Sequence, residues 1–233
     1  MLLEVKDLDV SYVESRICKG VNLQVGSGEQ VCLLGRNGVG KTTLLKSIMR
    51  LLPSKDGTII FDGVPINRLK PYEVAKLGIG YVPQGRIIFP HLTVLENLRL
   101  GTTARKERNR AVPEIVFEYF PRLKERHKQR GGTLSGGEQQ MLAIARALAS
   151  VPKLVLLDEP SEGLSAGVIE ELIKVLRRLC QETDLAILLV EQNLEIALDL
   201  ATRGYVMEKG CIVAEGKMTE LQSDEIVRSH LMV

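Results

Sequence analysis

The sequence predicts an α/β fold in which a mostly parallel sheet carries helices on both faces. Short apolar segments alternate with helical patterns along most of the chain, as is typical of parallel strands joined by crossover helices. Two of the apolar segments, at 29–34 and 153–158, lead into residue types that are suited to phosphate or metal binding, namely a glycine-rich segment and a pair of carboxylates. Ligands of open α/β sheets lie beyond the carboxyl ends of strands, so we expect these two ends to form one site.

Composition indicates an ordinary globular protein with a large core. The chain has 233 residues, of which 45% are hydrophobic and 26% charged, and these values exclude disordered and fibrous classes. The net charge of +2 favours no particular class of partner. No apolar run approaches the roughly 18 residues that span a bilayer. The four cysteines form no C-x-x-C pair, which predicts reduced thiols and a cytoplasmic protein.

The first third of the chain predicts a group of antiparallel strands that leads into the parallel sheet. Alternating hydropathy and glycine-containing turns indicate the strands, and 3.6-residue periodicity indicates the helices. The elements expected up to residue 84 are strands at 2–6, 8–12, 20–25, 29–34, 58–62 and 78–82 and helices at 41–51 and 71–77.

A glycine-rich segment at 35–43 lies between a predicted strand and a predicted helix, and it matches G-x-x-x-x-G-K-[ST] in full. Glycines allow successive backbone N–H groups to approach an anion, and the helix N-terminus adds a positive dipole end. We expect Lys41 to reach the β- and γ-phosphates and Thr42 to bind Mg²⁺. The predicted phosphate-binding residues are Gly35, Asn37, Gly38, Gly40, Lys41, Thr42 and Thr43.

The pattern becomes helical between residues 85 and 152. We expect an inserted helical subdomain there, while residues 1–84 and 153–233 form the nucleotide-binding core. Lysine and arginine cluster from 105 to 130, which usually marks a solvated helix face. The aromatic residues of this stretch, Phe117, Tyr119 and Phe120, form one block and are not interleaved with the basic residues for base stacking, so nucleic acid is not expected as a partner.

Ser135 and Glu138 have the spacing of a capping box before a helix predicted at 139–149. A well-capped helix is one interpretation. An anion site is the other, because glycines at 136 and 137 expose the backbone where the helix end is positive. A capping box does not need both glycines, and this favours the anion site.

The strand at 153–158 ends in two carboxylates. We expect Asp158 to meet the Mg²⁺ of the phosphate loop and Glu159 to face the water that attacks the γ-phosphate. Simple loop charge is the alternative. The remaining expected elements are a helix at 168–180, a strand at 185–190, a helix at 194–200, a hairpin of 204–208 and 211–215, and a helical tail at 217–233.

Together these motifs resemble the nucleotide-binding cassette of ABC ATPases over nearly the whole chain. Residues 134–138 are similar to the ABC signature, and Gln84 matches the Q-loop residue. Tyr12, by pattern alone a half-buried strand aromatic, matches the residue that stacks on adenine. The resemblance implies ATP held between two cassettes with Mg²⁺, a catalytic and metal-binding role for Gln84, and Ser135 and Gly137 serving the partner's ATP.

The chain also resembles the second ATPase of branched-chain amino-acid importers and of related urea and amide importers. Residues 32–41, 83–90 and 189–193 carry this likeness. It implies two integral-membrane permeases, a second ABC ATPase in a heterodimer or, in isolation, a homodimer, and indirectly a solute-binding protein. The protein would then be peripheral on the cytoplasmic face of the plasma membrane. The alternative is a soluble ABC ATPase that acts on nucleic acid or the ribosome.

Two positions depart from the wider family. Gln192 occupies the catalytic switch position, where histidine is usual, and Ser165 occupies a position where aspartate is usual. An amide can donate an N–H to the γ-phosphate but cannot carry a positive charge. These departures indicate that the two ATP sites of a heterodimer differ.

Overall fold

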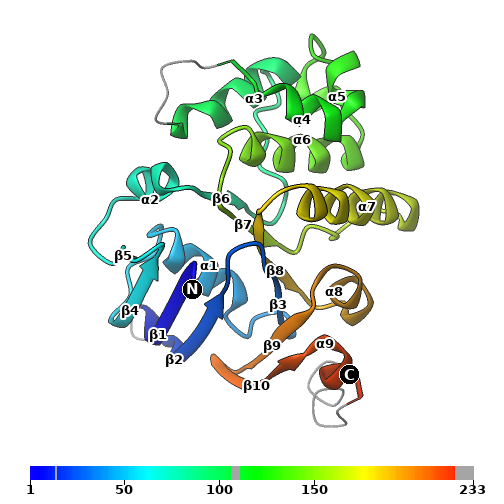
Figure 1. Ribbon diagram of the computed structural model, residues 1–233. Helices are drawn as coiled ribbons and strands as arrows, with labels where there is room; N and C mark the ends of the chain where they lie inside the picture. Colours follow the sequence, from blue (N-terminus) through cyan, green and yellow to red (C-terminus); the bar gives the residue numbers. More distant parts are fainter. Residues whose placement is uncertain (14, 106–110, 224–233) are drawn as a thin grey trace.

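Two sheets and a group of helices build the fold, which the computed structural model describes over residues 1–13, 15–105 and 111–223 (Figure 1). One sheet is antiparallel in the order β2-β1-β4-β5, and the other has the order β10-β9-β3-β8-β7-β6. In the second sheet only β10 pairs antiparallel among the described strands. The strands are β1 (Leu3–Tyr12), β2 (Ser15–Val25), β3 (Gln30–Leu34), β4 (Asp56–Phe61), β5 (Val64–Pro65), β6 (Ile79–Val82), β7 (Leu154–Asp158), β8 (Ala186–Glu191), β9 (Arg203–Glu208) and β10 (Cys211–Lys217).

The helices divide between the sheets and one end of the molecule. Figure 1 shows α3, α4, α5 and α6 gathered above the parallel sheet, while α1 lies beside the antiparallel sheet. None of the described helices is long and apolar enough to cross a bilayer. The helices are α1 (Lys41–Ile48), α2 (Pro71–Leu77), α3 (Val94–Gly101), α4 (Glu114–Tyr119), α5 (Pro121–Glu125), α6 (Gly136–Leu148), α7 (Ala166–Glu182), α8 (Leu194–Leu200) and α9 (Met218–Ser223), with short 3-10 turns at Thr102–Ala104 and Gly131–Thr133.

The core has two apolar layers, one on each face of the parallel sheet. Neighbouring residues of a strand point to opposite faces, so Leu33 packs in one layer and Leu34 in the other. Leu156 and Leu157 divide in the same way. The Leu33 layer includes α1 and the antiparallel sheet, and the Leu34 layer includes α6, α7 and α8. Each fully buried leucine contributes roughly 1.5–3 kcal/mol, which fixes both faces of the strands that carry the site.

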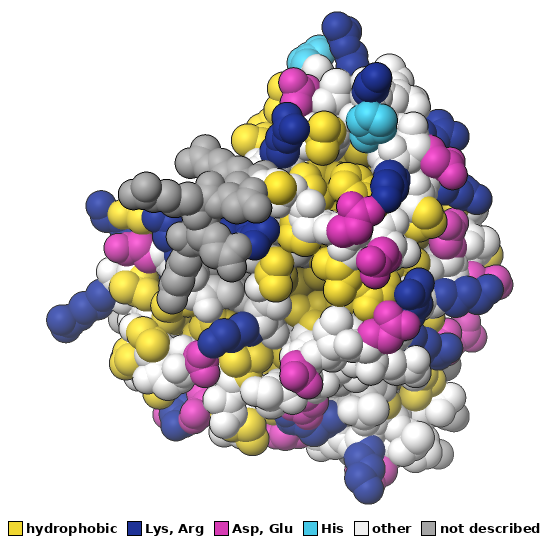
Figure 2. Space-filling view, turned by 45° about the horizontal axis from the view of Figure 1, so that its top comes forward, with side chains coloured by type: hydrophobic (Ala, Val, Ile, Leu, Met, Phe, Trp, Pro, Cys, Tyr) yellow, Lys and Arg dark blue, Asp and Glu magenta, His cyan; other side chains and the backbone are white. Residues whose placement is uncertain are grey.

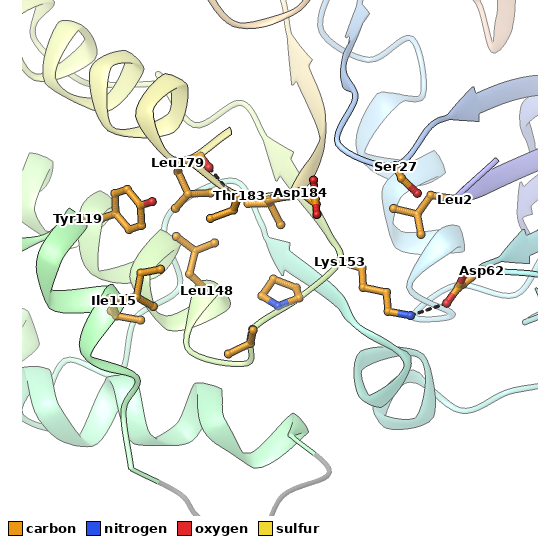
Figure 3. Close-up of a pocket in the computed structure, with 14 residues that line it drawn as sticks. Leu2, Ser27, Asp62, Ile115, Tyr119, Leu148, Lys153, Leu179, Thr183 and Asp184 are labelled. Carbon is orange, nitrogen blue, oxygen red and sulfur yellow. Dashed lines mark hydrogen bonds and ion pairs between the residues drawn. The ribbon is translucent and has the colours of Figure 1, made fainter. Parts of the chain in front are cut away.

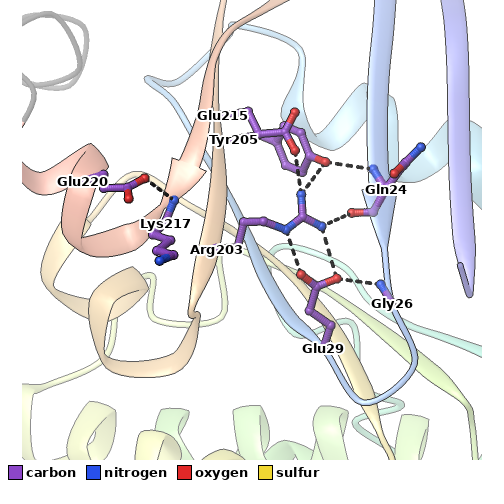
Figure 4. Close-up of polar contacts among 8 residues, drawn as sticks. All are labelled: Gln24, Gly26, Glu29, Arg203, Tyr205, Glu215, Lys217 and Glu220. Atoms are coloured by element: carbon purple, nitrogen blue, oxygen red, sulfur yellow. Dashed lines mark hydrogen bonds and ion pairs between the residues drawn. The ribbon is translucent and has the colours of Figure 1, made fainter.

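Arg203, at the start of β9, ties the parallel sheet to the turn before β3 (Figure 4). Its Nε and Nη2 donate to the two carboxylate oxygens of Glu29 at 2.7 and 3.1 Å, and Nη2 also donates to the carbonyl of Gln24 at 2.9 Å. Its Nη1 donates to the hydroxyl of Tyr205 at 2.6 Å and to Glu215 at 2.8 Å. A planar guanidinium holds such a fork rigidly, so this network fixes the end of β3 opposite the phosphate loop.

The α/β fold with a mostly parallel sheet is confirmed, whereas several boundaries differ from those predicted. Residues 2–6 and 8–12 form one strand, β1, whose pairing is irregular around Asp7. β2 begins at Ser15 instead of residue 20. The helix predicted to end at 51 ends at Ile48, because Arg50 takes a positive φ of 58°.

The bounds of two later helices also differ from those predicted. α6 begins at Gly136, three residues earlier than predicted, because the capping box places both glycines in its first turn. The predicted tail helix is present only as α9, and residues 224–233 lie outside the described part, as do 106–110 of the basic cluster.

Candidate nucleotide site

The predicted phosphate loop joins β3 to α1 and lines a hollow of about 420 Å³. Two glycines are required by its shape. A Cβ at Gly35 would lie 2.6 Å from the carbonyl oxygen of Met207, and Gly40 takes a φ of 115°, which L side chains rarely adopt. The residues that line the hollow are Ile17, Asn37, Gly38, Gly40, Lys41, Thr42, Thr43, Gln84 and Glu159.

Lys41 supplies a buried cation to this hollow. Its side chain is 4% exposed, and its Nζ donates to the carbonyls of Gly35 at 2.6 Å and Arg36 at 2.9 Å. The same Nζ lies 3.0 Å from Oε1 of Glu159, whose side chain is 6% exposed. A pair this buried is costly to break from one side only, so the two residues act as one unit.

Asp158 lies behind the hollow and is 1% exposed. Its Oδ1 accepts a hydrogen bond from the Thr42 hydroxyl at 3.0 Å, and its Oδ2 accepts one from the Tyr81 hydroxyl at 3.1 Å. Burial raises the pKa of Asp158, and these two hydrogen bonds oppose that rise. The strand end and the phosphate loop therefore meet, as the sequence predicts.

The donor set at this meeting point fits a hard cation. Mg²⁺ prefers oxygen ligands and takes only one or two carboxylates, with waters and substrate phosphates completing its shell. Thr42, Asp158 and Gln84 offer a hydroxyl, a carboxylate and an amide oxygen. Among the described residues no group of three or more His, Cys, Asp or Glu side chains could hold a metal, so an all-protein cage is absent from that part.

Glu159 has a strained backbone at the edge of the hollow. Its φ of 47° is unusual for a residue other than glycine, and conformations of this kind cost on the order of 1–3 kcal/mol and cluster at functional sites. Its N–H donates to the carbonyl of Val190 at 3.0 Å. Gln84 donates its amide to Oε2 of Glu159 at 3.3 Å and to Glu162 at 3.0 Å. Glu159, which follows β7, and Gln84 are thus brought together.

The signature segment forms a separate site at the start of α6. Ser135 accepts a hydrogen bond from the N–H of Glu138 at 3.3 Å and donates its own N–H to that carboxylate at 2.9 Å. The predicted capping box is therefore present. A Cβ at Gly137 would lie 2.7 Å from Val168, and one at Gly136 would lie 2.8 Å from Arg86. Packing against the short Val168 side chain thus accounts for Gly137, whereas Gly136 faces only the end of the flexible Arg86 side chain, which can move.

The two sites do not meet within this chain. A second hollow of about 70 Å³ includes Ser135 and Gly137 in its lining, and it shares no lining residue with the hollow at the phosphate loop. α1 and α6 pack on opposite faces of the parallel sheet. Ser135 is exposed at the N-terminus of α6, so its hydroxyl can reach a second molecule.

The residues predicted to contact adenine and the γ-phosphate, Tyr12 and Gln192, do not line the hollow at the phosphate loop. Tyr12, at the end of β1, is exposed, and Ile17 of β2 lines the hollow instead. Gln192 follows β8 and is also exposed. Their predicted roles toward adenine and the γ-phosphate stay predictions.

Four residues at the site were missed by the sequence argument. Tyr81 reaches Asp158 because β6 and β7 are neighbours, with Tyr81 paired to Leu156. The periodicity of a sequence does not report the order of strands in a sheet, so no sequence signal identified Tyr81. The other three are Ile17, Glu162 and Glu191.

A third hollow, of about 740 Å³, lies among the ends of α6 and α7, helix α4 and the segment before β7 (Figure 3). Its lining is largely aliphatic, and Lys153 forms an ion pair with Asp62 at one side. Figure 2 shows hydrophobic side chains gathered across the middle of one face of the molecule. This hollow includes no residue of the phosphate loop, and the cation at its edge is already paired. It therefore lacks the features that recognise a nucleotide.

The fold and the strand–loop–helix unit around Lys41 define a P-loop nucleotide-binding protein. A family described as ABC transporter matches residues 18–162. The chain belongs to this family, and it is an ABC ATPase that binds and hydrolyses ATP. The predicted resemblance to ABC cassettes is confirmed.

Known proteins resemble the chain over nearly its full length. It is 41% identical to the high-affinity branched-chain amino acid transport ATP-binding protein BraG of Pseudomonas aeruginosa, over 97% of both chains. It is 35% identical to the lipopolysaccharide export system ATP-binding protein LptB of Escherichia coli K12, over 97% of this chain and 95% of LptB.

Solved cassettes have the same fold. A dimeric post-hydrolysis cassette bound to ADP and Pi superposes with a TM-score of 0.83 and 28% identity, covering 93% of this chain and 98% of the other. A nucleotide-free cassette of an ABC transporter gives a TM-score of 0.85 and 27% identity, covering 100% of this chain and 99% of the other.

Proposed function

We propose that this ABC ATPase powers the import of branched-chain amino acids through membrane permeases. The similarity to BraG carries the proposal, and a probable branched-chain amino acid transport protein, LivF of Archaeoglobus fulgidus, supports it at 38% identity over 97% of this chain and 95% of LivF. Urea or short amides are the alternative solutes, because residues 32–41 and 83–90 resemble urea-type cassettes. Lipopolysaccharide export is a second candidate, favoured by the 35% identity to LptB.

In this proposal the hollow at the phosphate loop receives the phosphates of ATP. Lys41 exchanges its bonds to the loop carbonyls and Glu159 for the β- and γ-phosphate oxygens. That exchange frees Glu159 to orient the attacking water and accept its proton. Thr42, Asp158 and Gln84 would hold Mg²⁺, which neutralises developing charge on the phosphates when bound. Tyr12 would stack on adenine, and Gln192 would donate its amide to the γ-phosphate.

The second wall of the site comes from another cassette. Ser135 and Gly137 lie at the positive end of α6 and line a hollow that shares no residue with this chain's phosphate-loop hollow, so we assign them to the partner's ATP. The similarity to a dimeric post-hydrolysis cassette supports this arrangement. A heterodimer with a sister ATPase fits the departures at Gln192 and Ser165, and a homodimer is the arrangement expected in isolation.

The permease-docking surface is assigned to the segment that follows Gln84. Ile87, Phe89 and Leu100 are exposed apolar side chains, which are costly unless a partner covers them. Arg146 of α6 lies over the Phe89 ring at 5.3 Å and donates to the carbonyl of Ile87 at 2.6 Å. Motion of the docked segment is therefore passed to α6, the helix that Ser135 caps. This supports treating 85–152 as one inserted subdomain.

Isolation of the protein from gently solubilised native membranes, followed by mass spectrometry, tests this function. Two multi-spanning permeases and a second ATPase are expected, and the matching solute-binding protein can then be screened with branched-chain amino acids and with urea. Lipopolysaccharide-export partners would favour the second candidate. Ribosomal proteins or nucleic acid without a permease would overturn transport altogether.

A pair of variants makes the same experiment specific to the docking surface. Phe89→Glu is expected to lose the permeases while it retains ATP binding, because a charge cannot be buried in an apolar contact. Val213→Glu is the matched control, since Val213 is also exposed but lies on β10. Equal recovery of permeases with both variants would remove Phe89 from the docking surface.

A further inference from the structure

Glu191 is a buried carboxylate that none of the proposed steps of ATP hydrolysis uses. It ends β8, the strand between β3 and β7, and it is 1% exposed. Burying a carboxylate costs several kcal/mol unless other groups satisfy it. Its presence at the carboxyl ends of the strands that carry the site therefore requires a physical reason.

Hydrogen bonds from two different loops converge on its side chain. Oε1 accepts the hydroxyl of Ser161 at 2.6 Å and the N–H of the same residue at 3.4 Å. Oε2 accepts the N–H of Gln192 at 3.2 Å. Burial raises the pKa of Glu191, and these hydrogen bonds oppose the rise. Among the described residues the charge is compensated by neutral donors instead of an ion pair.

The backbone of Glu191 adds a third connection. Its carbonyl accepts the N–H of Gly35 at 3.3 Å, at the first residue of the phosphate loop. One residue thus joins the phosphate loop, the segment after Glu159 and the segment that contains Gln192. Movement of either loop alone would leave a buried acceptor unsatisfied, which is unfavourable, so the loops are held in one arrangement.

This arrangement bears directly on the strained backbone of Glu159. The N–H of Glu159 is held by the carbonyl of Val190, and Ser161, two residues further, is held by the carboxylate of Glu191. The two bonds fix the chain on both sides of Pro160. They therefore maintain the φ of 47° that directs Glu159 toward Lys41.

We propose that Glu191 is a positioning residue of the ATPase site, which holds the 159–161 turn and the backbone of Gln192 in register with the phosphate loop. The proposal rests on the proposed function, because it takes Glu159 as the group that orients the attacking water. It requires no contact between Glu191 and ATP. Loss of the network is thus expected to lower turnover without weakening nucleotide binding.

Ser161→Ala and Glu191→Gln test this in the full chain. Ser161→Ala removes only the hydrogen bond from the hydroxyl. Glu191→Gln keeps the side-chain shape but replaces one accepting oxygen with an NH₂ group, which cannot accept the hydrogen bond of Ser161 or Gln192 that points at it. Each is expected to lower kcat about tenfold while the Kd for ATP stays within twofold, because a small misplacement of a reacting group slows chemistry strongly. Ser223→Ala is the control, since that hydroxyl also donates to carbonyls but lies on α9.

Comparing kcat with Kd distinguishes positioning from general destabilisation, because destabilisation lowers kcat and also weakens ATP binding, which raises Kd. The double variant is expected to be no slower than the slower single variant, since both changes break the same bond. Wild-type kcat in Ser161→Ala, with circular dichroism and ATP affinity unchanged, would overturn the proposal. Ser161→Ala keeps the test decisive if Glu191→Gln does not fold. Failure of the role proposed for Glu159, on which this inference rests, would be seen separately, as normal turnover in Glu159→Gln.

Discussion

The phosphate-loop site and the signature site are built in opposite ways. At the phosphate loop, Lys41 contacts Glu159 and Thr42 contacts Asp158, so residues more than 100 positions apart meet in a buried cluster. At the signature, Ser135 bonds only within the first turn of its own helix among the contacts described, and its side chain faces outward. The phosphate-loop site is thus buried by contacts within its own chain, whereas the signature site is a local turn that is exposed on one side.

This difference supports the proposal that a single cassette is incomplete. The phosphate-loop site has its own cation and acids, and changes there are expected to act within this chain. The helix N-terminus at the signature site does not reach the ATP that this chain's own phosphate loop would hold. Changes there are therefore expected to act on a second subunit. Variants that break one site or the other can therefore separate self-contained from shared functions.

The largest effect is expected from Glu159→Gln. Removing the carboxylate is expected to slow ATP turnover about 100-fold, near the lower end of the range for a lost general base, while ATP still binds. Single-turnover hydrolysis and equilibrium ATP binding measure the two quantities. Glu162→Gln is the control, because Glu162 also accepts a bond from Gln84 but is exposed. Equal turnover in Glu159→Gln and wild type would remove Glu159 from catalysis.

Lys41→Ala is expected to have the next largest effect, on binding. Loss of charge-assisted hydrogen bonds to the phosphates is expected to weaken ATP binding by about 2–3 kcal/mol, or roughly 30- to 150-fold. Titration calorimetry measures the Kd. Lys46→Ala, at the other end of α1, is expected to bind normally. Retained affinity in Lys41→Ala would mean that the phosphate loop has been misassigned.

Ser135→Ala tests whether the signature site acts on a second subunit. The variant is expected to lose about 1 kcal/mol of its own stability, because the helix cap is removed, and to lower hydrolysis at the partner's site about tenfold. Photolabelling with an azido-ATP analogue under trapping conditions shows which subunit retains nucleotide. Thr93→Ala removes the matching capping box of α3 and is expected to change stability alone. The same trapping in both variants would contradict a role in trans.

Asp158→Asn is expected to separate stability from activity within the phosphate-loop site. Burial raises the pKa of Asp158, so the native state holds a proton more tightly than the unfolded chain. Stability then falls as pH rises from the unfolded pKa through the higher folded pKa, and the full cost is present above the folded value. Without nucleotide or divalent cation, Asp158→Asn should raise stability above that pH by on the order of 1 kcal/mol.

Chemical denaturation in EDTA across the acidic range measures this effect. The gain should shrink toward low pH, where the native carboxyl is protonated. Asp199→Asn, which removes an exposed partner of Arg177, is the control and should show no such gain. A loss of stability at neutral pH in Asp158→Asn would show that the hydroxyl bonds outweigh the burial cost.

Gln192→His is expected to change least. Gln192 is exposed and lies outside the hollow of the phosphate loop, so a histidine can occupy the position without repacking. Turnover is expected to stay within about threefold of wild type or to rise, because imidazole can also donate an N–H to the γ-phosphate. Steady-state ATPase rates measure this. A fall beyond tenfold would show that the site is built around the amide.

Short-range chemistry in the sequence was sufficient to predict the parts that local geometry controls. The glycines and Lys41 of the phosphate loop, the capping box of Ser135 and the acids after β7 each depend on neighbours within a few residues. The alternation of strands and helices was enough for the fold class, because periodicity reports which side of an element is buried.

Which distant residues meet follows from the way the sheets and helices pack. The order of β6, β7, β8 and β3 places Tyr81 on Asp158 and Glu191 on Ser161, and strand order depends on the packing of whole sheets. The tertiary structure also gave Gly137 a packing role against Val168, which periodicity cannot show. The sequence by itself determined the chemistry that each segment can offer, whereas the packing of the sheet faces determined which of these segments act together.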